Sequence, residues 1–456
     1  MKIPRILFAA PASGMGKTTI TCGFLAVLKK RNVDIISFKC GPDYIDTLFH
    51  SHVLGVPSYN IDTFLTGEKN AKFLFYKNAV GKKMAVIEGV MGYYDGLGST
   101  TLKASSYDVA NVTKTPVIMV IRPKGMSLSV AALLKGFLQY QQKSYIKGVI
   151  LNGVSQMFYQ TLKDVIEKEL PIKVYGYLPQ KQEFALQSRH LGLVTPDDTK
   201  QLQKKLYYLA EEMEKNMDIE GIMSLAESAE ELPDMVLPKN EVEKKCTIAA
   251  AKDRAFCFYY KDNLQYLEEN GCQLVYSSPL KDKNLPKEAD GIFLGGGYPE
   301  LYAKELSQNN TMIASIKNAI AQGMPVWAEC GGFLYLHETL QDAQEKSYAM
   351  VGAIKAHAFG EKQLKHFGYI TLQAQKDTFL CKKGESIPAH EFHYWQSTNP
   401  GNAFLAEKYS KKRSWQCIHD QRNIFAGFAH IHFYGNTIFA DNWIKQCIQW
   451  RREKKV

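Results

Sequence analysis

The sequence predicts an α/β protein built from two doubly wound domains, and three observations lead to this fold class. Short apolar segments typical of buried strands alternate with helical segments in both halves of the chain, as in parallel sheets. The length of 456 residues exceeds what one hydrophobic core usually serves, so two domains are expected. Hydrophobic residues make up 45% of the chain, which is enough for two cores.

In the first half, a strand over residues 6–10 leads into a glycine-rich loop, and a helix over residues 19–29 follows. Further buried strands, separated by helical segments, are expected at residues 33–38, 84–87, 116–121, 148–152 and 174–179. Doubly wound sheets bind ligands beyond the carboxyl ends of their strands. Site residues of the first half should therefore directly follow strands.

A proline-flanked stretch, Leu232 to Pro238, precedes a fresh strand and indicates a domain boundary. We expect a first domain over residues 1–235, a linker over residues 236–244 and a second domain over residues 245–456. Strands of the second domain are expected at residues 247–251, 273–276, 291–294 and 324–328.

Composition and charge indicate where the protein is located and which partners it binds. No uncharged apolar run reaches about 18 residues, so no membrane span is predicted. The first residues lead directly into a strand and a loop, unlike a signal peptide, which favours a cytoplasmic location. The nine cysteines form no C-x-x-C pair, which argues against a zinc site or a disulfide framework. The net charge of +10 is consistent with a solvated basic surface, or with an acidic ligand; no nucleic-acid motif is present.

Residues 11–18 read Pro-Ala-Ser-Gly-Met-Gly-Lys-Thr between a strand and a helix, the context of a phosphate-binding loop. Backbone N–H groups and the helix N-terminus would hold phosphate oxygens. Lys17 would reach the β- and γ-phosphates of ATP, and the Thr18 hydroxyl would lie on Mg²⁺. Pro11 stands where the common pattern has its first glycine, so the loop is a variant. The expected ATP contacts in the loop are Ser13, Gly14, Met15, Gly16, Lys17, Thr18 and Thr19.

Polar side chains follow two further strands of the first half. Lys39, Asp43, Tyr44 and Asp46 come after the second strand, with Asp43 as a candidate Mg²⁺ ligand. Asp46 or Tyr44 would orient a substrate, and a plain turn with an exposed aspartate is the alternative. Glu88 follows a buried strand and precedes glycines, which suits a second metal ligand beside phosphates.

In the second half, Cys330 lies between an apolar strand and the start of a helix. A nucleophile on such a sharp turn stands clear of the sheet. The N–H group of Gly331 could stabilise an oxyanion, with Gly296 and Gly297 of another glycine-rich turn on the other side. A buried structural cysteine is the alternative interpretation.

A cysteine nucleophile needs a base that increases its thiolate fraction. His430 and His432 near the C-terminus are the candidates, and on a strand both would point to the same face. A pair of core histidines is the alternative.

The first-half motifs resemble those of the cobyrinic acid a,c-diamide synthases, whose N-terminal half is similar to dethiobiotin synthetase. The matching segments, which include Gly-Pro-Asp-Tyr-Ile-Asp and Arg-His-Leu-Gly-Leu, are residues 11–18, 41–46, 88–96 and 189–193. The family's loop shares the proline variant. The resemblance implies ATP–Mg²⁺ binding by Lys17 and Thr18, with Asp43 and Glu88 as metal ligands.

The same resemblance implies further contacts. It places Asn152 near the adenine of ATP. It also places five residues near the substrate, namely Lys39, Tyr44, Asp46, Arg189 and His190.

The order of strand, cysteine-bearing turn and late histidine resembles class I glutamine amidotransferases, which have a flavodoxin-like fold. This resemblance implies that Cys330 attacks the side-chain amide of glutamine and releases ammonia. His430 aligns with the catalytic histidine, while His432 stays open as the alternative base. His432 occupies the position where most class I members have a glutamate, a departure shared with the cobyrinic-acid and cobyric-acid branch.

The two resemblances cover nearly the whole chain and imply an ATP- and glutamine-dependent ligase of cobalamin biosynthesis. It would amidate the a and c acetates of cobyrinic acid through acyl phosphates, with Mg²⁺ as cofactor. Hydrogenobyrinic acid and nickel-sirohydrochlorin stay open as substrates, and the related cobyric acid synthases usually lack two of the matching segments. The expected partners are a corrinoid polycarboxylate, ATP and glutamine, without nucleic acid or membrane, in a homodimer.

Two alternatives belong to other functional classes. A partition-type ATPase would bind DNA through the basic surface, but it leaves the second half of the chain unexplained. A non-catalytic regulatory protein would not need Lys17, Glu88, Cys330 and His430 together.

Overall fold

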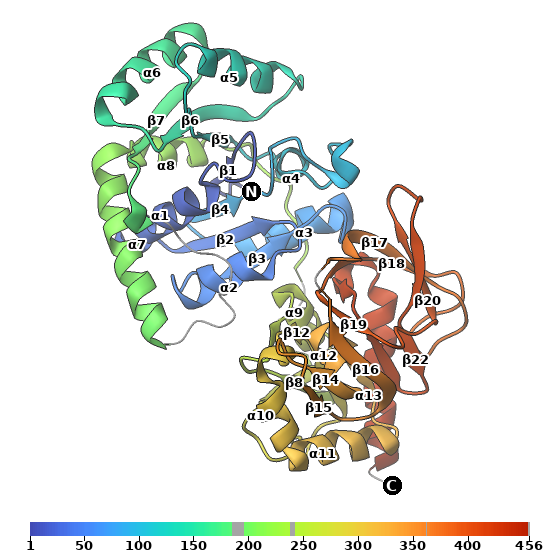
Figure 1. Cartoon of the computed structure of the whole chain (residues 1–456). Helices are drawn as coiled ribbons and strands as arrows, with labels where there is room; N and C mark the ends of the chain where they lie inside the picture. The colour runs from blue at the N-terminus through green and yellow to red at the C-terminus, as the bar shows by residue number, and fades with distance from the viewer. Residues whose placement is uncertain (185–195, 238–241, 362, 455–456) are drawn as a thin grey trace. The chain divides into compact units, whose positions relative to one another are not determined.

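The computed structural model describes residues 1–184, 196–237, 242–361 and 363–454, which form two compact units (Figure 1). The first unit spans Met1–Leu237 and the second spans Pro238–Val456, and each is described by itself. The division falls inside the expected linker of residues 236–244, of which residues 238–241 lie outside the described residues.

The first unit is organised around a seven-stranded parallel sheet in the order β3-β2-β4-β1-β5-β6-β7. Its strands are β1 (Arg5–Ala9), β2 (Ile35–Cys40), β3 (Ser58–Ile61), β4 (Met84–Glu88), β5 (Val117–Ile121), β6 (Ile146–Asn152) and β7 (Lys173–Leu178). Its helices are α1 (Lys17–Lys30), α2 (Tyr44–His52), α3 (Gly67–Ala79), α4 (Ser106–Thr113), α5 (Ser129–Gln139), α6 (Gln156–Glu169), α7 (Pro196–Asn216) and α8 (Ile219–Glu227). The doubly wound sheet predicted for this half is confirmed.

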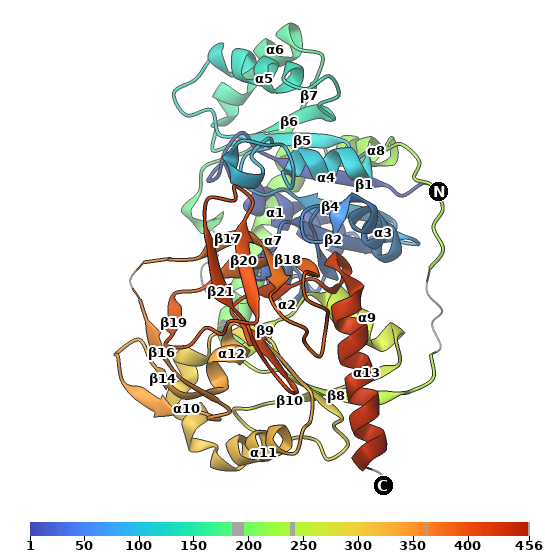
Figure 2. The same ribbon diagram turned by 90° about the vertical axis from the view of Figure 1, so that its right-hand side faces the viewer.

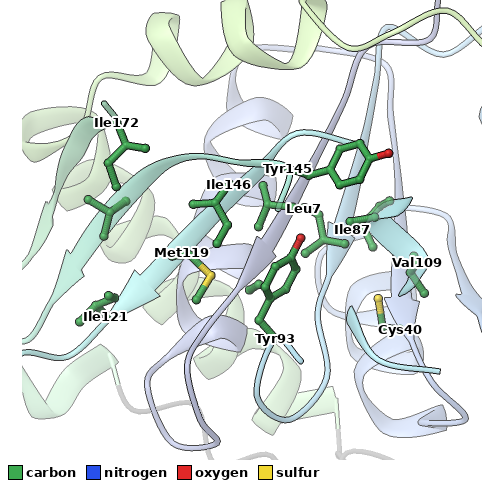
Figure 3. Close-up of a cluster of buried hydrophobic side chains, with 14 of the residues drawn as sticks. Leu7, Cys40, Ile87, Tyr93, Val109, Met119, Ile121, Tyr145, Ile146 and Ile172 are labelled. Carbon is green, nitrogen blue, oxygen red and sulfur yellow. The ribbon is translucent and has the colours of Figure 1, made fainter. Parts of the chain in front are cut away.

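Helices cover both faces of this sheet, so its strands are apolar on both sides. In β1, Leu7 packs toward α3, α4, α5 and α6, whereas Ile6 and Phe8 pack toward α1, α7 and α8. Figure 3 shows part of the first cluster, in which Leu7, Ile87 and Met119 come from three adjacent strands. Alternate residues of one strand thus serve two cores, because successive side chains point to opposite faces.

The edge strand β3 was not among the predicted strands. Its sequence, Ser58-Tyr59-Asn60-Ile61, is short and half polar, so it lacks the apolar run by which the other strands are identified. It pairs with β2 through Ser37 and the three residues that follow.

The second unit contains a six-stranded sheet in the order β10-β8-β11-β13-β23-β22, in which only β22 is antiparallel among the described strands. Its strands are β8 (Cys246–Ala251), β10 (Cys272–Ser277), β11 (Gly291–Leu294), β13 (Val326–Glu329), β22 (His419–Gln421) and β23 (Ile424–Gly427). The helices of the unit are α9 (Lys261–Glu269), α10 (Ala303–Gln308), α11 (Asn310–Ala321), α12 (Gly331–Tyr335) and α13 (Thr437–Lys454). Helix α13 packs against β8 (Figure 2). The α/β class predicted for this half is confirmed.

Three smaller sheets complete the second unit. A two-stranded sheet joins β9 (Phe256–Phe258) to β12 (Gly296–Gly297). A mixed sheet has the order β15-β14-β16-β19, with β14 (His337–Gln341), β15 (Ser347–Ala349), β16 (Ile354–Gly360) and β19 (Trp395–Ser397). An antiparallel sheet has the order β21-β20-β17-β18-β24, with β17 (Phe367–Ala374), β18 (Ser386–Phe392), β20 (Phe404–Lys408), β21 (Ser414–Cys417) and β24 (His430–Ile431). Strands β16 and β18 alternate buried residues with more exposed ones, and the other strands of these sheets are shorter or less regular. Apart from the strand expected at His430, no strand was predicted in these sheets.

No helix within the described part of the chain is long and apolar enough to cross a membrane.

Two candidate active sites

The loop between β1 and α1 has the backbone of a phosphate-binding loop. Gly14 and Gly16 have φ values of 78° and 98°, which other residues rarely adopt, and α1 begins directly afterwards at Lys17. A Cβ atom on Gly16 would lie 2.0 Å from Nδ2 of Asn152, which donates a hydrogen bond to the Met15 carbonyl at 2.8 Å. Asn152 therefore supports the loop from the end of β6, and its contact with adenine stays a prediction.

Lys17 is nine-tenths buried and turns back onto the main chain of its own site. Its Nζ donates to the Met91 carbonyl at 2.5 Å and to the Ala12 carbonyl at 3.4 Å. Burial, with the positive charge of Lys39 nearby, lowers the pKa of Lys17 to about 8. A bound phosphate would offer this ammonium group stronger acceptors than two carbonyls.

A buried charge network extends from the loop across the ends of β2 and β4. Oε1 of Glu88 accepts hydrogen bonds from Thr18 at 2.6 Å and from Lys39 at 2.8 Å. Lys39 also pairs with Asp46 at 2.5 Å, and His50 Nε2 lies 3.3 Å from Oε2 of Glu88. The ends of parallel strands meet at one edge of a sheet, and the network lies there.

The network shifts the pKa values of its two carboxylic acids in opposite directions. Burial alone would raise the pKa of Glu88, but Lys39 and His50 outweigh it and hold that pKa well below its usual range. Burial, with the charge of Glu88, raises the pKa of Asp46 to about 6. Glu88 therefore stays ionised at any physiological pH, whereas Asp46 takes up a proton as the pH falls through about 6.

The residues predicted to hold Mg²⁺ fit that ion in part. Thr18 and Glu88 present two hard oxygen donors side by side beneath the loop. Asp43 caps α2, since its Oδ1 accepts from the N–H groups of Ile45 at 2.8 Å and Asp46 at 3.2 Å. Within the described ranges, no cluster of three or more His, Cys, Asp or Glu residues could hold a metal by itself. A nucleotide-bound Mg²⁺ does not need one, because phosphates and waters complete its coordination.

The other site residues predicted in the first half differ in their surroundings. Ser13 is exposed at the tip of the loop, and Tyr44 begins α2 as a buried residue beside the charge network. Arg189 and His190 lie outside the described residues. His50 was missed by the sequence analysis, although it lies four residues after Asp46 and thus on the same face of α2.

A second missed feature is an open pocket of about 640 Å³ that begins at Pro11 of the loop. Aromatic rings form one side of it, with Tyr94 and Phe137 stacked at 5.6 Å between ring centres and Tyr140 4.9 Å from Tyr94. These residues come from the β4–α4 connection and from α5 or its end, so no single motif reveals them.

In the second unit, Cys330 stands on a strained turn between β13 and α12. Its backbone angles are φ 46° and ψ −102°, which a residue with a Cβ rarely adopts. Its N–H donates to the Gly427 carbonyl at 2.8 Å, which ties the turn to the end of β23. Such strain is typical of a nucleophile presented beyond the edge of a sheet.

The glycines predicted to form an oxyanion hole lie against this turn. A Cβ atom on Gly331 would lie 3.0 Å from the Gly297 nitrogen, and one on Gly296 would lie 2.5 Å from Cε1 of His430. Any larger side chain at these two positions would push the backbone segments or the imidazole away. The absence of side chains thus lets N–H groups, nucleophile and histidine meet in one place.

The structure brings His430 to the nucleophile. Its imidazole is hydrogen-bonded to the Cys330 thiol and lies 3.5 Å, Nδ1 to Oε2, from Glu329. Burial opposes the imidazolium form, but Cys330 and Glu329 outweigh it and raise the pKa of His430 to about 10. His430 therefore carries its proton near neutral pH, with Cys330 and Glu329 beside it.

His432 has different neighbours. Its Nε2 lies 3.9 Å from Oδ2 of Asp262, and its ring packs 5.0 Å from that of Tyr260. Strand β24 ends at Ile431, and His432 precedes the short helix η5 (Phe433–Gly435). The expectation that both histidines lie on one strand and share a face is therefore not met, because the strand ends between them.

A strained cysteine with a histidine and glycine amides beside it, in a flavodoxin-like unit, defines a glutamine amidotransferase of the class I type. The parallel sheet with a phosphate-binding loop defines a nucleotide-binding unit. Family models agree with both assignments. Residues 6–194 match the CobQ/CobB/MinD/ParA nucleotide binding domain, and residues 247–438 match the CobB/CobQ-like glutamine amidotransferase domain.

Relatives of nearly equal length carry both units. The chain is 41% identical to a cobyrinate a,c-diamide synthase of Caldanaerobacter subterraneus subsp. tengcongensis, over 98% of this chain and 99% of that protein. Proteins of the same name from Clostridium acetobutylicum and Listeria monocytogenes are 38% and 39% identical, over 96% and 95% of this chain and 99% and 97% of theirs. The chain belongs to the cobyrinate a,c-diamide synthase family. The predicted enzyme class, a glutamine-dependent amidating ligase, is confirmed.

Proposed function

We propose that this protein uses ATP and glutamine to amidate the a and c acetate groups of cobyrinic acid, in cobalamin biosynthesis. The observation that supports this most directly is the presence, in one chain, of the Cys330–His430 pair and the loop with Lys17, in a family whose members are named for this product. Residues 245–456 would release ammonia, and residues 1–235 would activate the carboxylate.

In the first reaction, the Cys330 thiolate attacks the side-chain carbonyl carbon of glutamine. The oxyanion forms against the N–H groups of Gly297 and Gly331, and His430 gives its proton to the departing ammonia. A thioester remains on Cys330. Water then attacks it, His430 takes the proton of that water, and glutamate leaves as the thiol is restored.

In the second reaction, a substrate carboxylate attacks the γ-phosphorus of ATP, which yields an acyl phosphate and ADP. A carboxylate is a poor acyl donor because oxide is a poor leaving group, and phosphate is a good one. Lys17 and the N–H groups of the loop stabilise the charge on the transferred group. Mg²⁺, held by Thr18 and Glu88 with Asp43 nearby, would neutralise further charge. Ammonia then displaces phosphate and leaves the amide.

The aromatic pocket beside Pro11 is the place that we assign to the ring of the substrate. A tetrapyrrole has a wide apolar face that would stack on Tyr94 and Phe137. Lys39, Tyr44 and Asp46, and with them Arg189 and His190, would then act on its carboxylates. Hydrogenobyrinic acid and nickel-sirohydrochlorin are the rival rings for the same chemistry.

Mass spectrometry of cobyrinic acid incubated with the protein, ATP, Mg²⁺ and glutamine tests the proposal. Two amidations per ring are expected, with the a and c positions identified by NMR. Glutamine hydrolysis without a corrinoid product would reject cobyrinic acid, and nickel-sirohydrochlorin would be the next substrate. A homodimer located in the cytoplasm is part of the proposal, and light scattering of the purified protein tests the dimer.

A further inference from the structure

One buried carboxylate, that of Glu329, lies beside the pair formed by Cys330 and His430. Glu329 precedes the nucleophile in sequence, and its side chain is 4% exposed. A carboxylate removed from water to this extent is costly unless charged or hydrogen-bonding groups face it. The groups that face Glu329 therefore indicate what it does.

Each oxygen of Glu329 has a different set of neighbours. Oε1 accepts a hydrogen bond from Nε1 of Trp327 at 2.8 Å and a longer one from the Ile431 N–H at 3.4 Å. Oε2 faces Nδ1 of His430 at 3.5 Å. Oε1 thus fixes the orientation of the carboxylate, while Oε2 is directed at the imidazole.

Backbone geometry explains how two consecutive residues reach the same histidine. Successive residues of a strand point to opposite faces, so Glu329 shares the face of Trp327. The φ of 46° at Cys330 breaks this alternation, and the thiol turns toward the same imidazole. Strand β23 pairs with β13 up to Gly427 and so delivers His430 three residues later to the side of Glu329.

We propose that Glu329 is the positioning residue of the glutaminase site: its carboxylate orients His430 and stabilises the imidazolium formed beside the Cys330 thiolate. It supplies the function that other class I enzymes obtain from a glutamate two residues after the histidine, where this chain has His432. The carboxylate thus comes from the strand that carries the nucleophile. This inference rests on the proposed role of Cys330 in glutamine hydrolysis.

The surroundings of His430 contain few other charges that could take this role. His390 lies opposite His430 on β18, and burial, with the charge of His430, lowers the pKa of His390 to about 3, so that ring is neutral. Tyr259, directly after β9, is half-buried; its hydroxyl is bonded to main-chain groups, and its removal from water raises the pKa of Tyr259. Among the described neighbours, Glu329 is therefore the anion that His430 faces besides Cys330.

Glu329→Gln is the discriminating variant, because glutamine keeps an oxygen acceptor for Trp327 and Ile431 and removes only the charge. We expect kcat for glutamine hydrolysis to fall about 10- to 100-fold, with KM changed by less than about threefold. The rate of Cys330 alkylation by iodoacetamide, followed on its own peptide, should shift to higher pH by about one unit, because the thiolate loses a stabilised imidazolium. Glu329→Asp should restore part of both effects.

Asp262→Asn is the matched control, since Asp262 is the buried carboxylate beside His432. It should leave the alkylation profile of Cys330 in place. A shift caused by Asp262→Asn and not by Glu329→Gln would overturn the proposal and favour His432 as the base. A uniform loss of activity at every pH, with an unmoved alkylation profile, would also overturn it, since that pattern indicates a merely structural role.

A measurement without any change at Glu329 covers the case in which Glu329→Gln does not fold. In Cys330→Ala, burial alone would lower the pKa of His430 below its ordinary value, whereas a Glu329 carboxylate would keep it above that value. NMR titration of the His430 ring decides between the two, and a lowered pKa would overturn the inference. If the unmodified protein fails to hydrolyse glutamine at all, the proposed function fails instead, so the two outcomes are distinguishable.

Discussion

The two candidate sites are prepared for chemistry in different ways. In the first unit, Lys39 is paired with both Glu88 and Asp46, and Lys17 is bound to main-chain carbonyls. In the second unit, the backbone is strained at Cys330, and Gly296 makes room for His430. Phosphoryl transfer needs charge placed around a mobile polyanion, whereas a nucleophile needs one fixed geometry. Loss of charge should therefore impair the first site, and added volume the second.

Removal of the nucleophile should have the largest effect and should affect only one of the two sites. Cys330→Ala should reduce glutamine-dependent amidation by at least about 10³-fold, because no thioester can form. Amidation with added ammonium chloride should stay within about twofold of the unmodified protein, since the first site is untouched. Product formation measured with each nitrogen source checks this. Loss of both activities would contradict the division of labour between the units.

Removing the loop lysine should have the opposite pattern. Lys17→Ala should reduce product by about 10³-fold with glutamine and with ammonium alike, because the transferred phosphoryl group loses a stabilising charge. Glutamine hydrolysis, measured as glutamate release, should remain measurable. Retained synthesis in this variant would exclude the loop as the site of ATP chemistry.

A substitution that adds one methyl group tests whether the second site tolerates added side-chain volume. Gly296→Ala places a Cβ atom 2.5 Å from Cε1 of His430, so the imidazole must move. Glutamine hydrolysis should fall about 100-fold, since sub-ångström to ångström shifts of a catalytic group have effects of this size. In Gly360→Ala, the control, the added atom lies 3.5 Å from its nearest neighbours, so activity should be unchanged. Equal activity of the two variants would show that His430 is not held tightly.

The role of charge in the first site is tested by pH, with the smallest expected effect. Lys17 has a pKa of about 8 without nucleotide, and bound phosphates should raise it, so ATP binding takes up a proton near and above pH 8. The Kd for ATP should therefore rise from pH 8 to pH 9.5, by at most about tenfold per pH unit. Calorimetric titrations over this range check it. Lys17→Arg, which stays charged, should give a flatter profile, and a flat profile in the unmodified protein would refute the prediction.

Sequence patterns determined the parts of this protein that depend on neighbouring residues. The alternation of apolar strands and helices predicted both parallel sheets, and the loop before Lys17 and the turn at Cys330 are each contained in one short segment. These features are readable because backbone conformation at a turn depends on local glycines and on the strand and helix that flank it.

Tertiary structure decided which distant groups meet. The pairing of β13 with β23 brings His430 beside Glu329, and the end of β24 leaves His432 beside Asp262. In the first unit, the pairing of β2 with β4 brings Lys39 to Glu88, with His50 arriving from α2. Such contacts depend on the order of the strands in the sheet and on the residue at which a strand ends. Neither can be predicted from the spacing of residues in the sequence. This matters most for buried charged residues. Each of them needs a partner of opposite charge or a hydrogen-bonding group, and the fold brings that partner from a distant part of the sequence.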